Sequence, residues 1–313
     1  MLLLHLSDVD EAGWARRLKA ELGDYPLVRR EDDFDPRDIR YLFVWKPKAD
    51  AFEGLDRLKA ILSLGAGVDA LLKHPALPPD VPLVRFVAED LSQRMSDYVV
   101  ANVTMHHRQF NRFKADQAAR RWVQFYPPSA EFTTVGIMGL GSLGIDAARR
   151  LLALGFSVRG WSRTPKAIAG VESFAGESEL DAFLSGTGIL VNLLPLTPET
   201  TGILNYQTFA KLRRDGLEGG PVVINAARGG HQKEADIVKA LSDGTLSAAS
   251  LDVFEVEPLP AESPLWALPN CYITPHIAAI SNMETGAAYF ARMIRDHEAG
   301  QPLRNVVDRD RGY

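Results

Sequence analysis

Short apolar runs alternate with segments of helical periodicity along the first hundred residues of the chain. The runs have the length of buried strands, and segments such as Trp14–Leu22 and Val68–Lys73 repeat their apolar positions at helical spacing. Strands that alternate with helices usually form a parallel sheet. The pattern therefore predicts an α/β domain with strands at Leu2–Leu6, Tyr25–Arg29, Arg40–Trp45, Ala60–Leu64 and Leu83–Phe86.

The pattern changes after this first domain. Residues 96–121 contain neither proline nor glycine and carry scattered apolar positions, which predicts one or two long helices that end by the Tyr-Pro-Pro sequence at 126–128. The periodicity at 282–299 predicts a last helix that stops at Gly300. Between them we expect a second α/β unit, with strands at Thr133–Leu140, Ser157–Trp161, Ile189–Leu194, Val222–Ala226, Ala248–Val253 and Tyr272–Thr274.

A glycine-rich turn follows the first strand of this second unit. Residues 133–144 read TTVGIMGLGSLG, and a helical pattern continues through residue 152. In a dinucleotide-binding turn of this kind, Gly139 allows the tight turn, Gly141 lets the backbone approach a pyrophosphate, and Gly144 lets the helix pack closely on the strand. The N–H groups at the start of the helix favour the anion. The alternative is a glycine-rich turn that binds no ligand.

The end of the next strand indicates which dinucleotide is bound. NAD-binding units usually place an acidic residue there, about 20 residues beyond the glycines, to bind the ribose 2′-hydroxyl. Here the strand ends in GWSRTPK (160–166), without an acidic residue. Arg163 can form a forked contact with a 2′-phosphate, to which Ser162 or Thr164 can donate. We therefore expect NADP(H) rather than NAD(H), although a solvated turn or the use of both cofactors stays open.

Composition and charge exclude several classes of function. Of the 313 residues 46% are hydrophobic, and 35 Lys and Arg stand against 40 Asp and Glu, so the net charge of −5 argues against a general nucleic-acid binder. Cys271 is the single cysteine, permits no intrachain disulfide and is interpreted as a packing residue. Neither a signal segment nor an apolar stretch of about 20 residues is found. We expect a cytoplasmic protein without a metal site or a membrane contact.

Three polar residues follow predicted strands of the second unit. Arg228 precedes a Gly-Gly pair, Glu257 precedes a proline, and His276 lies in the sequence TPHIA. Ligands of doubly wound sheets bind at the carboxyl ends of the strands, where these residues are expected. Taken singly, each has an ordinary explanation as a structural or surface residue. Together, beside a nucleotide-binding turn, they favour a catalytic site.

The chain resembles the D-isomer-specific 2-hydroxyacid dehydrogenases. The motifs of that family occur in its order at 139–144, 195–202, 225–229, 252–260 and 274–278. The similarity to the glyoxylate/hydroxypyruvate reductase A branch extends to 64–69, 161–164, 264–266 and 307–313. Two stretches depart from the family pattern, which leaves open a local helix cap and the choice of substrate: 231–236 and 93–97.

The resemblance implies a role for each catalytic candidate. Arg228 holds the substrate carboxylate and polarises its carbonyl group, and His276 donates a proton to the carbonyl oxygen as hydride arrives. Glu257 holds His276 protonated near neutral pH. Charge that builds on the oxygen is thus met by two cations. Asp252 lies near the nicotinamide end.

The resemblance also implies two sets of binding residues. The cofactor set is Gly139, Leu140, Gly141, Ser142, Leu143, Gly144, Trp161, Ser162, Arg163, Thr164, Lys166, Leu194, Pro195, Leu196, Thr200, Ala226, Ala227, Arg228, Asp252, His276, Ala278 and Ala279. The substrate set is Trp45, Gly65, Ala66, Gly67, Val68, Arg228 and His276. Packing in the core is the alternative for Trp45.

These observations lead to one expected architecture and function. We expect two Rossmann-like or flavodoxin-like parallel-sheet domains, with an NAD(P)-binding domain (100–280) inserted in a substrate domain (1–99 and 281–313). The expected enzyme is an NADPH-preferring oxidoreductase that reduces glyoxylate and hydroxypyruvate, and a homodimer through the helical arm at 98–121. A reductase of bulkier 2-ketoacids and a non-catalytic NAD(P)-sensing protein are the alternatives.

Overall fold

The computed structural model describes residues 1–312 and divides into two compact units. Unit 1 contains Met1–Leu91 together with the segment that begins at Ser281, and unit 2 contains Ser92–Ile280. Along the chain, the second unit is therefore inserted into the first. The sequence placed the first boundary after residue 99. Helix α3 (Glu89–His107) runs through that position without a break, and the division falls near its start.

Unit 1 is built on a five-stranded sheet in the order β2-β1-β3-β4-β5. Each neighbouring pair of strands is parallel, and the order is that of flavodoxin-like folds, with a switch point beside β1. The prediction of a parallel α/β domain is confirmed. The strands are β1 (Leu2–Leu6), β2 (Leu27–Arg29), β3 (Tyr41–Trp45), β4 (Ala60–Ser63) and β5 (Leu83–Val84).

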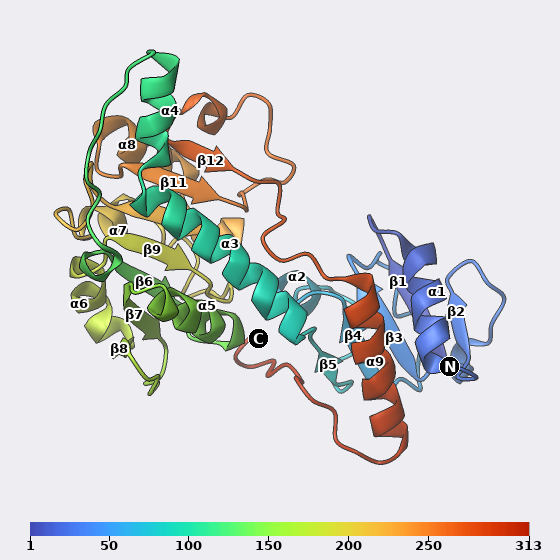
Figure 1. The fold of residues 1–313 in the computed structure, drawn as a ribbon. Helices are drawn as coiled ribbons and strands as arrows, with labels where there is room; N and C mark the ends of the chain where they lie inside the picture. The colour runs from blue at the N-terminus through green and yellow to red at the C-terminus, as the bar shows by residue number, and fades with distance from the viewer. Residues whose placement is uncertain (313) are drawn as a thin grey trace. The chain divides into compact units, whose positions relative to one another are not determined.

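Two helices from opposite ends of the chain cover one face of this sheet. Helices α1 (Glu11–Leu22) and α9 (Met283–Glu298) lie side by side in Figure 1. They approach closely because the Trp14 ring lies over Gly286, where a Cβ would be 2.5 Å from its Cη2. Phe43 of β3 contacts Trp14 edge-on at 5.4 Å between ring centroids. The C-terminal helix therefore completes the core of the first unit.

Unit 2 is built on a seven-stranded sheet in the order β12-β11-β10-β9-β6-β7-β8. All neighbouring strands are parallel, and the order is that of a Rossmann fold with one additional strand. The strand order reverses between β6 and β9, so a ligand is expected at their carboxyl ends. The strands are β6 (Thr134–Met138), β7 (Ser157–Ser162), β8 (Val171–Ala175), β9 (Ile189–Asn192), β10 (Val222–Asn225), β11 (Ala248–Leu251) and β12 (Cys271–Ile273).

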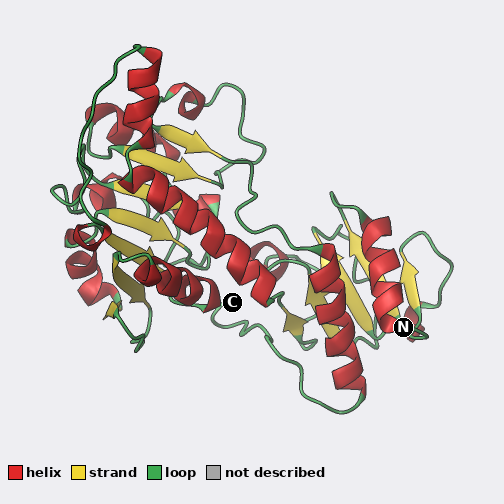
Figure 2. Cartoon of the chain, in the orientation of Figure 1, coloured by secondary structure: helices red, strands yellow, loops and turns green. Residues whose placement is uncertain are grey.

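Helices cover both faces of the seven-stranded sheet (Figure 2). Alternate residues of a strand point to opposite faces. Ile189 and Val191 of β9 therefore belong to the hydrophobic cluster under α3 and α5, whereas Leu190 belongs to the cluster under α6, α7 and α8. The helices are α5 (Ser142–Ala153), α6 (Leu180–Ser185), α7 (Tyr206–Ala210) and α8 (Glu234–Asp243).

The long helical region is interrupted. Helix α3 ends at His107, and Gln109 adopts a left-handed conformation (φ 55°) before α4 (Phe110–Ala118) begins. The helical arm expected at 98–121 is thus two helices, and it ends before the prolines at 127 and 128 because Arg120 is also left-handed (φ 52°). No helix of the described residues is both long and apolar enough to cross a bilayer.

One helix and several single turns complete the fold. Helix α2 (Asp69–Leu72) follows β4 and contributes Leu71 to the core of unit 1. The short turns are 3-10 helices: η1 (Pro36–Asp38), η2 (Ala130–Phe132), η3 (Glu177–Glu179), η4 (Gly229–His231) and η5 (Pro264–Ala267).

Candidate active site

The glycine turn joins β6 to α5 at the switch point of unit 2. Gly139 has a positive φ of 102°, and its N–H donates to the Trp161 carbonyl at 2.8 Å. A Cβ on Gly144 would lie 1.9 Å from the Gly139 carbonyl oxygen, so only glycine lets α5 start this close to the strand. The strand, turn and helix that the fingerprint requires are all present.

Neither the backbone conformation of Gly141 nor a contact with the described residues requires glycine at this position. Its φ of −81° suits any residue, and none of the described atoms lies within 4 Å of where its Cβ would be. No side chain of the described residues caps the N-terminus of α5, and its first turn carries no acidic residue. The exposed N–H groups beside Gly141, Ser142 and Leu143 can therefore hold a pyrophosphate. Leu140 is buried beneath the turn.

The end of β7 divides into a buried and an exposed part. The Trp161 indole N–H donates to the Gly176 carbonyl at 2.8 Å, and the ring is 9% exposed, so it belongs to the core. Ser162 is buried and donates to the Thr164 carbonyl at 2.8 Å, which shapes the turn. Arg163, Thr164 and Lys166 are exposed. The two cations at this tip can meet a 2′-phosphate.

The loop after β9 faces this turn from the other side of the switch point. Leu194 and Thr200 are buried, and Pro195 and Leu196 are half-buried. The Thr200 hydroxyl donates to the Pro195 carbonyl and accepts from the Thr197 N–H, each at 2.8 Å. Thr200 thus holds the loop in shape with its own side chain.

Buried amides hold the loop that carries Arg228. Asn192 and Asn225 end neighbouring strands, and the Asn192 side-chain Nδ2 donates to Asn225 Oδ1 at 3.0 Å. Asn225 donates to Gln232 Oε1 at 2.8 Å and to the Arg228 carbonyl at 3.1 Å, and it accepts from the Ala227 N–H. These three residues are not among the site residues predicted from the sequence, although a polar residue that ends a buried strand is a usable signal.

Arg228 lies where two loops come into close contact. A Cβ on Gly229 would lie 1.8 Å from the Phe254 carbonyl oxygen, so the loop after β10 touches the loop after β11. Ala226 and Ala227 are buried beside it, and Arg228 is half-buried. Its Nη1 donates to the Ala227 carbonyl at 2.7 Å.

Glu257 and His276 form a direct pair. His276 Nδ1 lies 2.7 Å from Glu257 Oε2, while Glu257 Oε1 accepts from the Phe254 N–H at 3.0 Å. Burial by itself raises the pKa of Glu257, but the hydrogen bonds from His276 and Phe254 and the positive charges of His276 and Arg228 outweigh it and lower that pKa. The carboxylate is therefore charged and holds the ring by Nδ1, which leaves Nε2 to act on a ligand.

Asp252 holds the loop that carries His276. This carboxylate is 1% exposed and accepts from the Thr274 hydroxyl at 2.6 Å and from the N–H groups of Ile277 and Ala278, both at 2.9 Å. His276 has a positive φ of 55°, and its N–H donates to the Asp252 carbonyl at 2.8 Å. A strained backbone of this kind persists only when its surroundings fix it. Both Asp252 oxygens are thus engaged within the protein.

The substrate residues expected in unit 1 meet at the carboxyl ends of β3 and β4. Trp45 ends β3, and its ring covers Gly65, where a Cβ would lie 2.5 Å from Cζ3. Val68 is buried, while Gly65, Ala66 and Gly67 are half-buried. The ring contact gives Trp45 a packing role and leaves part of it accessible.

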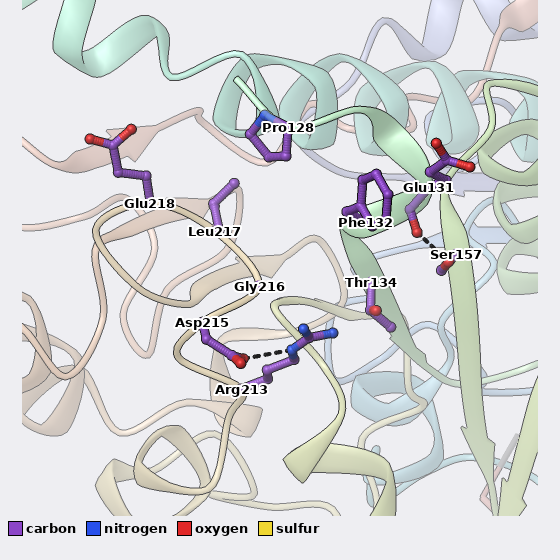
Figure 3. A pocket seen from close by; sticks show the side chains of 10 residues that line it. All are labelled: Pro128, Glu131, Phe132, Thr134, Ser157, Arg213, Asp215, Gly216, Leu217 and Glu218. Carbon is purple, nitrogen blue, oxygen red and sulfur yellow. Dashed lines mark hydrogen bonds and ion pairs between the residues drawn. The ribbon is translucent and has the colours of Figure 1, made fainter. Parts of the chain in front are cut away.

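A separate cavity lies at the opposite edge of the seven-stranded sheet. Its volume is about 300 Å³, and Figure 3 shows the side chains that line it. Thr134 and Ser157 begin β6 and β7, so the cavity is at the amino ends of these strands. The Arg213–Asp215 ion pair, at 2.7 Å, forms one wall. The catalytic candidates are at the carboxyl ends, so this cavity is not their site.

The chain is similar in sequence to a family of known proteins. The family model for the NAD-binding domain of the D-isomer specific 2-hydroxyacid dehydrogenases matches residues 100–278. A glyoxylate/hydroxypyruvate reductase A of Yersinia enterocolitica is 43% identical over 289 residues, which cover 91% of this chain and 90% of that protein.

Two solved structures resemble the chain over its whole length. One is an NADPH-dependent glyoxylate/hydroxypyruvate reductase from Sinorhizobium meliloti in complex with NADP and sulfate, with a TM-score of 0.93 and 44% identity. The other is a probable 2-hydroxyacid dehydrogenase from Rhizobium etli CFN 42 in complex with NADP, HEPES and L(+)-tartaric acid, with a TM-score of 0.92 and 47% identity. Each similarity covers 100% of this chain and 99% of the other.

Proposed function

We propose, because the chain belongs to the D-isomer-specific 2-hydroxyacid dehydrogenase family, that it is an NADPH-preferring reductase of small 2-ketoacids. Its reactions would convert glyoxylate to glycolate and hydroxypyruvate to D-glycerate. The observation that carries the proposal is the Glu257–His276 pair at 2.7 Å, with the charge of Arg228 beside it. Both similar structures described above hold NADP, which supports the choice of cofactor.

The proposed mechanism assigns one task to each residue. NADPH, when bound, supplies the hydride that reduces the keto carbon. Arg228 binds the substrate carboxylate through its forked guanidinium and draws electron density from the carbonyl group. His276 gives the proton from Nε2 to the carbonyl oxygen, and Glu257 stabilises the imidazolium before that transfer. One hydride and one proton together convert the 2-ketoacid to the 2-hydroxyacid.

Two features of unit 2 would hold the cofactor. The open space at Gly141 and the uncapped start of α5 accept the pyrophosphate. Arg163 and Lys166, at a strand end without an acidic residue, accept the 2′-phosphate. This set fits NADP(H) better than NAD(H), which carries a ribose 2′-hydroxyl and no 2′-phosphate for the two cations.

A substrate panel tests the proposed function. Glyoxylate, hydroxypyruvate, pyruvate and phenylpyruvate are each reduced with NADPH and with NADH, and cofactor oxidation is followed by absorbance. We expect the highest kcat/KM with a small 2-ketoacid and NADPH. Preference for phenylpyruvate would favour a reductase of bulkier acids instead. Tight NADPH binding without turnover on any acid would favour a sensing protein.

We further propose a cytoplasmic homodimer. Burial raises the pKa of Cys271, the single cysteine, to about 12, which suits a packing role in a reducing compartment. Around α4, aromatic side chains are unusually exposed: Phe110 and Phe113 by 57% and 40%, Trp122 and Tyr126 by 94% and 96%. Exposed apolar groups of this density mark contact surfaces, and the resemblance points to a second copy of the chain.

A further inference from the structure

A tyrosine of α3 contacts the loop that carries His276. The Tyr98 hydroxyl lies 2.9 Å from Thr274 Oγ1, although 176 residues separate the two in the chain. Tyr98 also packs against the hydrophobic cluster under α3 and α5, so its ring is fixed within unit 2. The proposed mechanism gives this residue no task.

The chemistry of the loop fixes the direction of this hydrogen bond. The Asp252 carboxylate accepts from two backbone N–H groups, so it receives the Thr274 hydroxyl proton at 2.6 Å as a third donor. A threonine has one hydroxyl proton, and Asp252 takes it. Tyr98 must therefore donate to Thr274 Oγ1. Burial raises the pKa of Tyr98 to about 12, which keeps the phenol protonated for this role.

This chain of hydrogen bonds reaches both sides of His276. Thr274 precedes it by two residues, and the Asp252 oxygens also bind the N–H groups of Ile277 and Ala278 that follow it. His276 itself is held in a left-handed conformation, with φ of 55°. A small displacement of this loop would move the imidazole away from Glu257, whose oxygen is 2.7 Å from Nδ1.

We propose that Tyr98 is a positioning residue for His276. Its hydroxyl donates to Thr274, Thr274 donates to Asp252, and Asp252 fixes the strained backbone that presents Nε2 of the imidazole. The inference rests on the proposed function, since it assumes that His276 donates a proton during reduction. Tyr98 itself contacts neither substrate nor cofactor in this scheme and acts through the loop.

Tyr98→Phe removes the hydroxyl and keeps the ring. We expect kcat for glyoxylate reduction to fall about 3- to 10-fold, the usual effect of one lost hydrogen bond, while the NADPH dissociation constant measured by fluorescence is unchanged. The solvent deuterium isotope effect on kcat should rise because proton transfer becomes slower. Tyr206→Phe is the control, since Tyr206 also donates from a hydroxyl, to Asp243 at 2.9 Å in a distant part of unit 2.

Two further variants, both at Thr274, make the test independent of whether the Tyr98→Phe protein folds. Thr274→Ser retains the hydroxyl and should keep most of the activity, whereas Thr274→Val should lose at least as much as Tyr98→Phe. If Tyr98→Phe and Thr274→Val both have the kcat and the solvent isotope effect of the wild type, this inference is overturned, whereas the proposed function stands. An equal loss in Tyr206→Phe would overturn it too. Absence of turnover in the wild type would overturn the proposed function and this inference with it.

Discussion

At the scale of single residues, three loops bring three side chains to one edge of a sheet. Arg228 follows β10, Glu257 follows β11 and His276 follows β12, and these strands are neighbours. Buried polar groups then fix each loop, with Asn225 beneath Arg228 and Asp252 beneath His276. The reacting groups themselves stay half-buried or exposed, where a substrate can reach them.

The first prediction concerns Arg163. Arg163→Ala removes a cation from a strand end that carries no acidic residue, so KM for NADPH should rise while KM for NADH stays nearly unchanged. A charge-assisted hydrogen bond is worth roughly 1.5–3 kcal/mol, which corresponds to about 10- to 100-fold. Steady-state kinetics with both cofactors measure this. Arg149→Ala, an equal change of charge on an exposed position of α5, is the control. Equal effects on both cofactors would contradict the assignment.

The second prediction concerns the alkaline limb of the pH profile. The proposed mechanism requires a protonated His276, whose Nδ1 lies 2.7 Å from the Glu257 carboxylate. The pKa of Glu257 is below its usual range, so this group keeps its charge near neutrality and does not itself shape the limb. Glu257→Gln keeps the shape of the side chain and removes the negative charge that stabilises the His276 imidazolium. The limb in kcat/KM should move to lower pH, and the rate at neutral pH should fall.

Glu255→Gln provides the control for that experiment. Glu255 is an exposed acid two residues away, and its carboxylate binds the Glu234 N–H instead of the imidazole. Its pH profile should match that of the wild type. If Glu257→Gln matches the wild type as well, Glu257 does not tune His276, and the proposed pair is abandoned.

At the scale of elements, the β6–α5 turn separates two uses of glycine. Gly144 is required by the packing of the protein itself, because its Cβ would lie 1.9 Å from a carbonyl oxygen. Gly141 has no such neighbour among the described residues, and its φ of −81° is ordinary. Gly144 is therefore required by the fold, whereas Gly141 is proposed to serve the ligand.

The third prediction follows from this difference. Gly144→Ala should destabilise the protein by about 1–3 kcal/mol, the usual cost of overpacking, because strand and helix must move apart. Gly141→Ala should leave the unfolding transition in urea unchanged but weaken NADPH binding by about tenfold or more, equivalent to 1.4 kcal/mol. Unfolding and fluorescence titrations of both variants measure this. A Gly141→Ala protein that binds NADPH as tightly as the wild type would place the pyrophosphate elsewhere.

The fourth prediction concerns the packing of α3 on β11. His106 is 4% exposed, its Nε2 lies 2.8 Å from Ser250 Oγ, and burial lowers its pKa to about 4. The unfolded chain takes up a proton near pH 6.5, whereas the folded one does not until about pH 4. The contribution of the neutral His106 side chain to the free energy of unfolding is therefore fully present above pH 6.5. It decreases as the pH falls from 6.5 to about 4, and about 2 kcal/mol of it is lost at pH 5.

His106→Gln removes this titration and keeps a side-chain amide that can hydrogen-bond Ser250 as donor or acceptor. The midpoint of thermal unfolding should then fall less between pH 7 and pH 5 than that of the wild type. Differential scanning calorimetry at both pH values measures the two differences. Equal decreases in the two proteins would show that His106 does not limit stability in acid.

At the scale of the whole molecule, the chain builds one unit, inserts the second and returns to complete the first. Helix α3 carries it into unit 2, and Ser281 begins the return. The core of unit 1 depends on that return, because Phe290 of α9 packs on Phe43 at 4.7 Å between ring centroids. The first unit therefore cannot complete its core until the whole chain has been synthesised.

The fifth prediction concerns assembly. A double variant, Trp122→Ser with Tyr126→Ser, removes the two most exposed aromatic side chains, which lie in the segment directly after the arm. Sedimentation equilibrium should show a dimer for the wild type and a shift toward monomer for the variant. Trp266→Ser is the control, because Trp266 is 54% exposed outside the arm. A wild type that is monomeric at micromolar concentration would contradict the proposed homodimer.

The sequence alone predicted the strand–helix alternation, both parallel sheets and the glycine turn, because these depend on local periodicity and local turn chemistry. It missed β8 (Val171–Ala175), a short strand that has no fully buried residue, is interrupted by the exposed polar Glu172 and Ser173, and is held by pairing with β7. It left open whether residues 96–121 form one helix or two and did not locate the break at Gln109, since no proline or glycine marks it. The order of the elements along the chain could thus be predicted from the sequence, whereas the edge strand β8 forms only because β7 pairs with it.

For the site, the sequence indicated Arg228, Glu257 and His276 as the candidates for the chemistry, since they stand at strand ends within recognisable motifs. Only the tertiary structure decided what holds them. The Asn225–Gln232 hydrogen bond and the contact of Tyr98 with Thr274 join residues whose side chains meet only after the strands have paired. A sequence pattern records the period of a helix or a strand, but a hydrogen bond between distant elements has no period. The residues that support the site, such as Asn225 and Tyr98, could therefore be identified only from the tertiary structure.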